Sequence, residues 1–318
     1  LAASTGVVGA SVVAMGVISL PVMLKYNYSK SLACGTICAS GTLGQIIPPS
    51  VVLIILGDVF QQPVGDLFEG AFWPGLTLVA VYILYILVVS FLNKDIAPAI
   101  PKSELTDSKA KQVVNAFKAI LPPLALIVLV LGSIFEGIAT PTESSAVGCI
   151  GAMILAWMYK SFSFKMIHEA SLETVRTTAM VFAILIGATA FSMVFSYTGG
   201  DEIVEEVMRG LPGEKWGFII VSMLAIMALG FFIDFVEISY IIVPILAPIA
   251  EAIGINPIWY ALLIALNLQT SFLTPPFGFS LFYLRGVAPP SVKTMDIYKG
   301  VVPFIILQVL VMVIFTLF

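Results

Sequence analysis

The sequence predicts an all-α polytopic membrane protein with re-entrant helical hairpins and two transmembrane helices that are broken by Pro-Pro pairs. The first observation is the composition: of 318 residues, 59% are apolar and 11% are charged, whereas a soluble domain carries about 25% charged residues. The mean hydropathy of +1.07 agrees with a chain that faces lipid. The second is a series of apolar stretches of about 20 residues, the length that crosses a bilayer. The third is that four of these stretches are interrupted by Gly, Pro or polar residues.

Charge and cysteine content narrow the possible partners. The formal net charge of −4 argues against a basic surface that binds nucleic acid. The three cysteines, Cys34, Cys38 and Cys149, lie in apolar stretches without a neighbouring histidine or acidic cluster. We therefore expect small buried apolar residues rather than zinc ligands.

Five apolar stretches are expected to form ordinary spanning helices because each is a single apolar run of spanning length. They are Ala71–Leu92, Phe117–Phe135, Ser144–Met158, Thr177–Tyr197 and Gly300–Phe318.

The four interrupted stretches are Leu1–Leu24, Ser31–Gly57, Gly217–Ile253 and Trp259–Leu284. An interruption leaves backbone N–H and C=O groups unpaired at membrane depth, so it must face protein, water or an ion rather than lipid. We interpret Gly217–Ile253, which is interrupted at Phe232–Glu237, as a hairpin that returns to the side it entered from. Leu1–Leu24 is then the second arm of a similar hairpin, and the two stretches with Pro-Pro pairs cross fully as two half-helices.

This layout separates the basic residues. Cytoplasmic loops hold an excess of Lys and Arg, and the layout places 13 of the 15 basic residues on one side. They are Lys25, Lys30 and those of the segments 93–118, 159–176 and 285–299. Only Arg209 and Lys215 fall on the other side. Interpreting a broken helix as a hairpin, or the hairpin as a span, would remove this separation.

The two broken crossings repeat a common order of residues. Pro48-Pro49 is followed by Asp66 and Pro74, and Pro275-Pro276 is followed by Asp296 and Pro303, so that corresponding positions are separated by a nearly constant length of chain. Pro21 and Pro244 mark the preceding hairpin arms. Because the two halves start from opposite sides of the membrane, we infer an inverted repeat, which is typical of a secondary transporter with its site near the midplane. The alternative is chance recurrence of Pro-Pro in an apolar protein.

Several of these motifs together resemble a known family. They are Ala3-Ser4-Thr5-Gly6, the segment 39–50 that ends in Pro-Pro-Ser, the segment 137–148 that contains Thr-Pro-Thr-Glu, and Leu273-Thr-Pro-Pro276 with Gly278. Over its whole length the chain resembles the large membrane subunit of tripartite ATP-independent periplasmic (TRAP) transporters. The resemblance implies sodium-coupled uptake of an organic acid across the bacterial inner membrane by an elevator motion. It also implies two partners, a periplasmic substrate-binding protein and a small membrane subunit.

The resemblance also divides the chain. Residues 1–70 and 217–299 are expected to be two halves of a transport domain, residues 71–216 mainly scaffold helices and loops, and residues 300–318 the last spanning helix. The chain opens at Leu1 without an initiator Met or a basic leader. Since family members begin upstream, we expect scaffold helices and one hairpin arm to precede Leu1.

The Pro-Pro breaks are the predicted sodium sites. Sodium prefers oxygen ligands, and unwound backbone at a helix C-terminal end offers carbonyls with partial negative charge. The candidate residues are Ser40, Gly41, Thr42, Gly44 and Pro48 at the first break, and Asn267, Gln269, Thr270 and Thr274 at the second. The alternative is that the prolines only kink the helices, with Ser and Thr bonding back to the chain.

An organic anion needs positive potential, and no Lys or Arg lies near the inferred midplane. Helix N-termini, whose free N–H groups and dipole bind carboxylates, are the remaining source, together with bound sodium. The candidate substrate-binding residues therefore lie where half-helices begin. They are Ser4, Thr5, Gly6, Pro49, Ser50, Asp234, Glu237, Pro276 and Gly278.

Two acidic motifs have a structural alternative. Asp234 and Glu237 are intramembrane acids and so functional candidates, but Asp-x-x-Glu is also a capping box. Both interpretations stay open, and they can coexist. For Thr140-Pro141-Thr142-Glu143 we favour a helix start.

Other polar features are expected at the surface. The sole histidine, His168, lies in an amphipathic segment, 162–174, that is interpreted as a solvated cytoplasmic loop. The acidic loop 201–210 and the segment 58–69 are a hypothetical docking surface for a soluble binding protein; the alternative is ordinary solvated loops.

Other functions fit less well. A stand-alone sodium- or proton-coupled organic anion symporter of similar fold is the competing interpretation. An intramembrane enzyme is disfavoured because the chain has no His-Glu-x-x-His, Gly-x-Ser-Gly or Gly-x-Gly-Asp motif, and a nucleotide-driven pump because it has no Gly-Lys-Ser/Thr loop.

Overall fold

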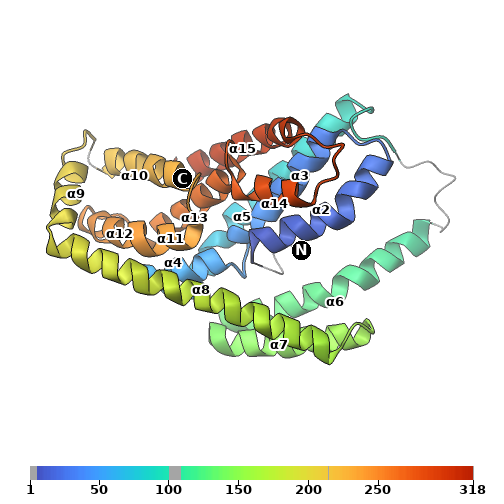
Figure 1. Ribbon diagram of the computed structural model, residues 1–318, viewed down its shortest axis with the longest axis horizontal. Helices are drawn as coiled ribbons and strands as arrows, with labels where there is room; N and C mark the ends of the chain where they lie inside the picture. Colours follow the sequence, from blue (N-terminus) through green and yellow to red (C-terminus); the bar gives the residue numbers. More distant parts are fainter. Residues whose placement is uncertain (1–5, 100–108, 214, 318) are drawn as a thin grey trace. The chain divides into compact units, whose positions relative to one another are not determined.

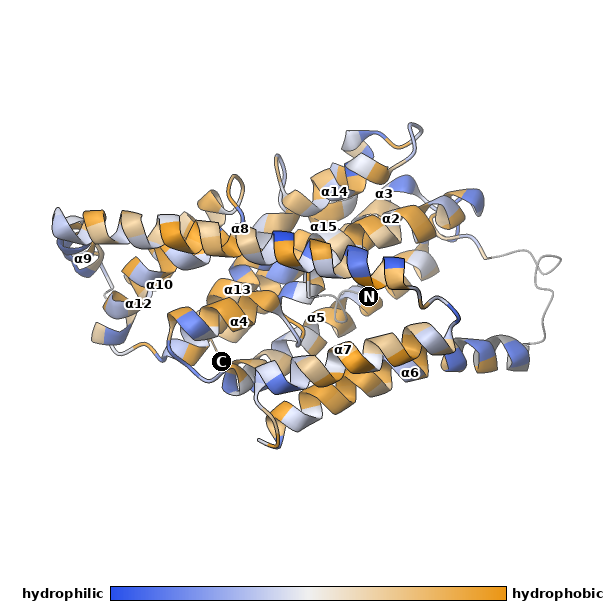
Figure 2. Ribbon diagram, turned by 60° about the horizontal axis from the view of Figure 1, so that its bottom comes forward, coloured by the Kyte–Doolittle hydropathy of each residue, from blue (hydrophilic) through white to orange (hydrophobic). Residues whose placement is uncertain are grey.

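The computed structural model describes residues 6–99, 109–213 and 215–317, and throughout these residues the secondary structure is helical. Six helices are long and apolar enough to cross a membrane. The prediction of an all-α multi-pass membrane protein is thereby confirmed. The chain divides into two compact units, one of residues 1–98 and 184–318 and the other of residues 99–183. Figure 1 shows the helices along the chain, and Figure 2 shows the hydrophobic residues that run along most of α6 and α7.

The larger unit contains both broken helices. Its first part consists of α2 (Val8–Lys25), α3 (Lys30–Thr42), η1 (Leu43–Gln45), α4 (Val51–Val59) and α5 (Val64–Leu92). Its second part consists of α10 (Lys215–Leu229), α11 (Phe235–Glu237), the π-helical turn η3 (Ile238–Ile242), α12 (Val243–Ala252), α13 (Pro257–Leu273), α14 (Phe279–Val287) and α15 (Thr294–Leu317). Both predicted Pro-Pro breaks are confirmed, because α3 and α4, and likewise α13 and α14, are separate helices.

A proline pair does not by itself break a helix. Pro122 and Pro123 lie inside α6 (Lys109–Phe135), which continues through them. At the two breaks, by contrast, Pro48-Pro49 and Pro275-Pro276 are followed by capping residues, Ser50 and Gly278, that begin a new helix. The capping residue therefore distinguishes a break from a helix that accommodates its prolines.

Two pairs of corresponding helices in the larger unit have equal length, and they lie at nearly equal spacing along the chain. α2 and the arm Phe235–Ala252 both contain 18 residues. α4 and α14 both contain 9 residues. When the starts of α2 and of the second arm are superposed, Pro21 corresponds to Pro248 and not to Pro244, so the pairing of Pro21 with Pro244 was wrong by one helical turn. The second arm carries both prolines, and composition alone did not identify the equivalent one.

The core of the larger unit lies around α13, whose residues 260–273 are all buried. α13 packs against α3, α4, α5, α10 and α15. α3 and α15 approach most closely at Gly35 and Gly300, where a Cβ on either glycine would overlap the backbone of the other helix. These contacts bring the two parts of the unit together, since α3 belongs to the first and α15 to the second.

The ends of the larger unit differ in charge. Lys30 Nζ donates to the Ser291 carbonyl at 2.6 Å, and Ser29 N donates to the Ile96 carbonyl at 2.8 Å, so three connections meet at one end. Six of the unit's eight basic residues lie there, namely Lys25, Lys30, Lys94, Arg285, Lys293 and Lys299. Arg209 and Lys215 lie with Ile253 around a cavity at the α12 end. Within this unit, the basic residues are separated as the layout predicts.

The smaller unit contains α6, α7 (Pro141–Met158) and the first part of α8 (Phe164–Tyr197). The predicted start of α7 is confirmed as a complete capping box: Glu143 N donates to Thr140 Oγ1 at 3.3 Å, and Thr140 N donates to Glu143 Oε2 at 2.8 Å. A hydrogen bond of 2.8 Å between the Ser133 and Ser144 hydroxyls joins α6 to α7.

One cysteine departs from its predicted environment. Cys149 is exposed, so the expectation of three buried cysteines holds only for Cys34 and Cys38. The reason is its place on α7, because the neighbouring Gly148 and Gly151 are the residues that approach side chains of α6.

Two segments interpreted as loops are helical. The segment 162–174 is largely the first turns of α8, and the segment 201–210 is mostly α9 (Gly200–Arg209). Charged side chains in these segments pair one turn apart, as Arg176 does with Glu173 and Arg209 with Glu205, both at 2.7 Å. Such pairs favour a solvated helix as well as a loop, which is why charge alone misled the sequence interpretation. His168 is exposed, as expected.

Candidate functional site

The first break begins where α3 ends at Thr42 and ends where α4 begins at Val51. The Ser50 side chain is buried; its hydroxyl donates to the Gln45 carbonyl at 2.6 Å and accepts from Leu53 N at 3.3 Å. Ser50 therefore caps α4. The hydrogen bond from Leu53 N to Ser50 occupies a first-turn N–H group of α4, so Leu53 N is not free to bind a substrate carboxylate. Pro48 is buried and Pro49 half-buried between the two helices.

The hydroxyls before the first break bond back to their own helix. Ser40 donates to the Ile37 carbonyl at 3.1 Å, and Thr42 donates to the Ala39 carbonyl at 2.9 Å. Each hydroxyl oxygen keeps lone pairs that can ligate a cation. Gly41 serves packing, because a Cβ there would overlap the Val12 side chain of α2. Gly44 is buried in η1.

The second break runs from Thr274 to Gly278. The hydroxyls of Thr270 and Thr274 donate to the carbonyls four residues earlier, at 2.8 Å and 2.7 Å. Gly278 has a φ of +30°, and a Cβ there would lie 2.9 Å from the carbonyl oxygens of both Phe272 and Thr274. Only glycine suits this position. Pro276 is exposed, and its carbonyl accepts a hydrogen bond of 2.7 Å from the Tyr298 hydroxyl.

Asn267 and Gln269, both predicted sodium ligands, differ in their contacts. Asn267 Nδ2 donates to the Met223 carbonyl at 2.7 Å and so joins α13 to the first arm of the hairpin. That hydrogen bond gives the Asn267 side chain a structural role. Gln269 is fully buried, and neither its amide oxygen nor its amide nitrogen has a hydrogen-bond partner among the described residues. Gln269 stays a predicted sodium ligand, with a buried amide oxygen that no described group occupies.

Each hairpin lies against the break of its own half. Gly6 has a φ of +61°, and a Cβ there would lie 2.9 Å from the Pro49 carbonyl oxygen. In the second half, a Cβ on Gly230 would overlap the Ser271 side chain of α13, and the Phe232 and Phe277 rings lie 5.2 Å apart. The first arm therefore meets its break at Pro49, and the second hairpin meets its break at Phe277 and the preceding helix at Ser271. Ser4 and Thr5 lie outside the described residues.

Aromatic residues beside the second break were missed by the sequence interpretation. A Cβ on Gly9 of α2 would lie 3.0 Å from Tyr283 Cζ, and Tyr283 lies within electrostatic range of Asp234. Tyr283 thus reaches from α14 toward both hairpins. Phe232 and Phe277 are substantially exposed although they lie at a helix break. Aromatic residues next to a Gly or Pro interruption are the signal that could have identified this group.

The acidic tip of the second hairpin forms only half of a capping box. Asp234 Oδ1 accepts from Phe235 N at 2.7 Å, so Asp234 caps α11 as one interpretation predicted. Glu237 does not complete the box, because its Oε2 atom is buried and has no hydrogen-bond partner among the described residues. The buried Ser239 hydroxyl, in the π-helical turn that follows, also has none there. Turns of π-helix are frequent at functional sites.

The residues at the two breaks fit a sodium ion. They offer hydroxyl and carbonyl oxygens, and the buried Gln45 side chain in η1 has an amide oxygen without a partner in the described chain. Gln45 was not among the predicted ligands. In the described parts of the chain, no group of three or more His, Cys, Asp or Glu side chains could hold a metal. The donor set therefore suits an alkali cation and not a transition metal.

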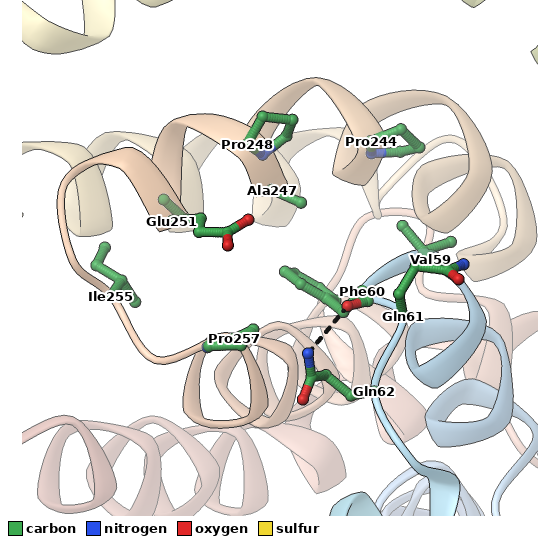
Figure 3. Close-up of a pocket in the computed structure, with 11 residues that line it drawn as sticks. Val59, Phe60, Gln61, Gln62, Pro244, Ala247, Pro248, Glu251, Ile255 and Pro257 are labelled. Atoms are coloured by element: carbon green, nitrogen blue, oxygen red, sulfur yellow. Dashed lines mark hydrogen bonds between the residues drawn. The ribbon is translucent and has the colours of Figure 1, made fainter.

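A cavity of about 350 Å³ lies elsewhere in this unit (Figure 3). The turn after α4, helix α12 and the start of α13 line it, and the Glu251 carboxylate points into it. Gln62 Nε2 donates to the Phe60 carbonyl at 3.2 Å at its rim. Among the described residues, no basic side chain lines it. No residue of either break lines this cavity, so we place the candidate site at the breaks instead.

The sequence matches a family model over residues 1–318, and the model describes the tripartite ATP-independent periplasmic transporter, DctM component. The chain belongs to this family. The resemblance found in the motifs is therefore confirmed, and the paired helix breaks belong to a TRAP large permease.

Curated relatives of this TRAP permease have different substrates in their names. The C4-dicarboxylate TRAP transporter large permease protein DctM of Pseudomonas aeruginosa is 31% identical over 287 residues, which are 90% of this chain and 66% of that protein. The isethionate TRAP transporter permease protein DctMQ of Oleidesulfovibrio alaskensis is 29% identical over 99% of this chain and 48% of its own length. The ectoine TRAP transporter large permease protein TeaC of Halomonas elongata is 29% identical over 99% of this chain and 72% of its own length. The chain thus spans between about half and three quarters of the length of these relatives.

Proposed function

We propose that this TRAP permease takes up a small organic acid across the bacterial inner membrane, driven by a sodium gradient. The observation that carries the proposal is the contact of each arm with a Pro-Pro break, at Gly6 with Pro49 and at Phe232 with Phe277. Irregular backbone inside a membrane protein is tolerated where it lines a cavity or binds an ion. Paired breaks of this kind are typical of secondary transporters.

The two parts of the larger unit act as an inverted repeat in this proposal. Two pairs of helices of equal length, α2 with Phe235–Ala252 and α4 with α14, at a nearly constant spacing along the chain support it. Residues 1–70 and 217–299 are the moving halves of a transport domain, residues 71–216 are mainly the scaffold, and residues 300–318 are the last spanning helix. Uptake then proceeds by an elevator motion, in which the transport domain carries the site across the membrane.

Sodium binds at the two breaks in this mechanism. Hydroxyl oxygens of Thr42 and Thr270, whose protons are already donated to helix carbonyls, supply lone pairs, and unwound carbonyls supply the remaining ligands. The ion adds positive potential beside the N-terminus of α14, where the capping residue Gly278 supplies no side-chain hydrogen bond. Its first N–H groups are thus available for a carboxylate. Substrate binding should therefore require sodium.

Asp234 contributes charge to the site as well as a cap. Asp234→Asn keeps an oxygen for the bond to Phe235 N and removes the charge. We expect sodium-dependent uptake to fall at least tenfold, about 1.4 kcal/mol, when full-length Asp234→Asn is compared with wild type in proteoliposomes. Unchanged uptake would show that Asp234 is only a helix cap.

A soluble binding protein delivers the substrate, and a small membrane subunit completes the complex. The names of the relatives, which include separate and joined permease proteins, support such an assembly. The acidic helix α9 and the residues 58–69 are the proposed docking surface. Reversing the charges of Glu205 and Glu206 tests it, because unchanged dependence on the binding protein would remove both residues from the interface.

The proposal is tested by uptake of a panel of labelled organic acids into proteoliposomes that contain the full-length permease, its small subunit and its binding protein. Uptake that needs both a sodium gradient and the binding protein is the expected result. Uptake without the binding protein would favour a stand-alone symporter, and uptake driven only by protons would remove the sodium sites.

A further inference from the structure

A group of buried polar side chains comes from three helices of the larger unit, α5, α13 and α15. Tyr82 of α5, Gln269 of α13 and Gln308 of α15 are 4%, 0% and 2% exposed. Four of their polar atoms have no hydrogen-bond partner among the described residues: Tyr82 Oη, Gln269 Oε1, Gln269 Nε2 and Gln308 Oε1. A buried polar group without a partner costs free energy comparable to a lost hydrogen bond. Four of them in one place require an explanation.

The three side chains are neighbours. The amides of Gln308 and Gln269 are the polar groups beside the Tyr82 hydroxyl, although neither meets hydrogen-bond geometry with it. The Tyr82 ring packs edge-on against Phe304 with ring centroids 5.0 Å apart. Phe304 and Gln308 lie one turn apart on α15, so the same face of α15 presents both to Tyr82.

Rotating the Gln269 amide by 180° does not give its atoms hydrogen-bond partners. Turning the Gln269 amide over only swaps the positions of its oxygen and nitrogen. Since neither atom has a partner among the described residues, neither orientation gives the amide a direct hydrogen bond there. A third molecule has to join them.

We propose that Tyr82, Gln269 and Gln308 hold at least one ordered water molecule. The groups are neutral and include both donors, the Tyr82 hydroxyl and Gln269 Nε2, and acceptors, the two amide oxygens. Water both donates and accepts, so one molecule can serve these donors and acceptors together. Buried water typically makes about three hydrogen bonds to polar groups of this kind.

The water would join the two halves of the larger unit. Gln308 Nε2 of α15 donates to Thr42 Oγ1 of α3 at 3.4 Å, so the last helix of the second half contacts the broken helix of the first. A second approach runs from the first half to the second, because Tyr82 of α5 lies beside Gln269 of α13. A water between these two contacts makes them one connected network. This inference does not depend on the transported substrate or on sodium.

The sign of one stability change tests the proposal. With water present, Tyr82→Phe loses a hydrogen bond, and the unfolding midpoint of the full-length permease is expected to fall by about 2 to 4 °C. Without water, the variant removes a buried hydroxyl that has no partner, so the midpoint would stay the same or rise, and either result would overturn the proposal. Tyr85→Phe is the matched control, because Tyr85 packs on Phe304 at 5.1 Å but is only half-buried; it should leave the midpoint unchanged.

A double variant tests whether the groups share one molecule. Tyr82→Phe combined with Gln269→Met should lower the midpoint by less than the sum of the single shifts, since both remove bonds to the same water. Additive shifts would contradict the shared site. In a high-resolution structure of the full-length permease, a solvent peak should lie within hydrogen-bond distance of Tyr82 Oη and Gln308 Oε1 in both sodium and potassium. An absent peak, or one seen only in sodium, would overturn the assignment to water.

Discussion

The two hairpin arms of the larger unit have the same length but different side chains. α2 and the arm Phe235–Ala252 each have 18 residues, and at their spacing Val7 corresponds to Asp234 and Ala10 to Glu237. The second arm contains a π-helical turn, whereas α2 is regular α-helix. The backbone arrangement is therefore repeated while the chemistry is not. Charge at the tip belongs to the second half, and close backbone packing at Gly6 and Gly9 belongs to the first.

The largest effect is expected where the second break depends on one glycine. Gly278→Ala should reduce uptake at least a hundredfold, because it adds positive-φ strain of about 1 to 2 kcal/mol to clashes with two carbonyl oxygens 2.9 Å away. Gly6→Ala, which meets one carbonyl at that distance, should have a smaller effect. Gly254→Ala is the control, since Gly254 has a φ of +74° but nothing within 4 Å of a Cβ. Equal losses in all three variants would show that backbone strain alone is responsible. Uptake in proteoliposomes measures the difference.

A second variant tests the charge that only the second tip carries. Glu237→Gln should lower sodium-dependent uptake about tenfold, which corresponds to losing one charged interaction of about 1.4 kcal/mol, because the buried Oε2 of Glu237 lacks a partner in the described chain. Glu251→Gln, on the same arm but in the cavity at its far end, should leave uptake unchanged. Equal effects of the two substitutions would mean that net charge matters and position does not.

A third variant tests the contact between the halves. Gln308→Leu removes the bond to Thr42, and we expect the sodium concentration for half-maximal uptake to rise about two- to fivefold, the effect of about 0.5 to 1 kcal/mol. Thr316→Val is the control on the same helix, because the Thr316 hydroxyl bonds to its own helix at Met312. If Gln308→Leu left the sodium dependence at the wild-type value, the contact of α15 with Thr42 would not contribute to sodium binding.

The smallest effect is expected at the start of α7, where Thr140-Pro141-Thr142-Glu143 is the second possible capping box. Unlike Asp234 and Glu237, Thr140 and Glu143 form a complete capping box, and the backbone hydrogen bond from Thr140 lowers the pKa of Glu143 below its ordinary value of 4.5. A lowered pKa in the folded state stabilises the fold above pH 4.5 and loses that contribution as the pH falls through the folded value.

Glu143→Gln should therefore lower the unfolding midpoint slightly at pH 7, and the difference from wild type should narrow at pH 4. Glu136→Gln, outside the capping box, is the control and should show no such change. If the difference in unfolding midpoint between Glu143→Gln and wild type grew toward acidic pH, the pKa of Glu143 would be shifted in the opposite direction to the one given.

Local features of this permease were determined by the sequence alone. Four of the five predicted spans, both breaks and the start of α7 depend on apolar length, on proline and on capping residues within a few positions, which act through neighbouring backbone. The fifth, Ser144–Met158, is not among the six described helices that are long and apolar enough to cross a membrane. The shared order around Pro48 and Pro275 likewise predicted two similar halves, although the sequence paired Pro21 with the wrong proline. Helices 162–174 and 201–210 were missed because a solvated helix and a polar loop have similar composition.

The roles of individual side chains were decided only by the tertiary structure. Ser50 caps a helix, the Pro276 carbonyl bonds to a tyrosine 22 residues away, and Asn267 bonds to the hairpin 44 residues away. Gln308 contacts Thr42 across 266 residues, and Tyr82, on a helix that the sequence interpreted as an ordinary span, lies beside Gln308. A hydrogen bond depends on distance and direction in space, and residues far apart in the chain acquire both only when the helices pack.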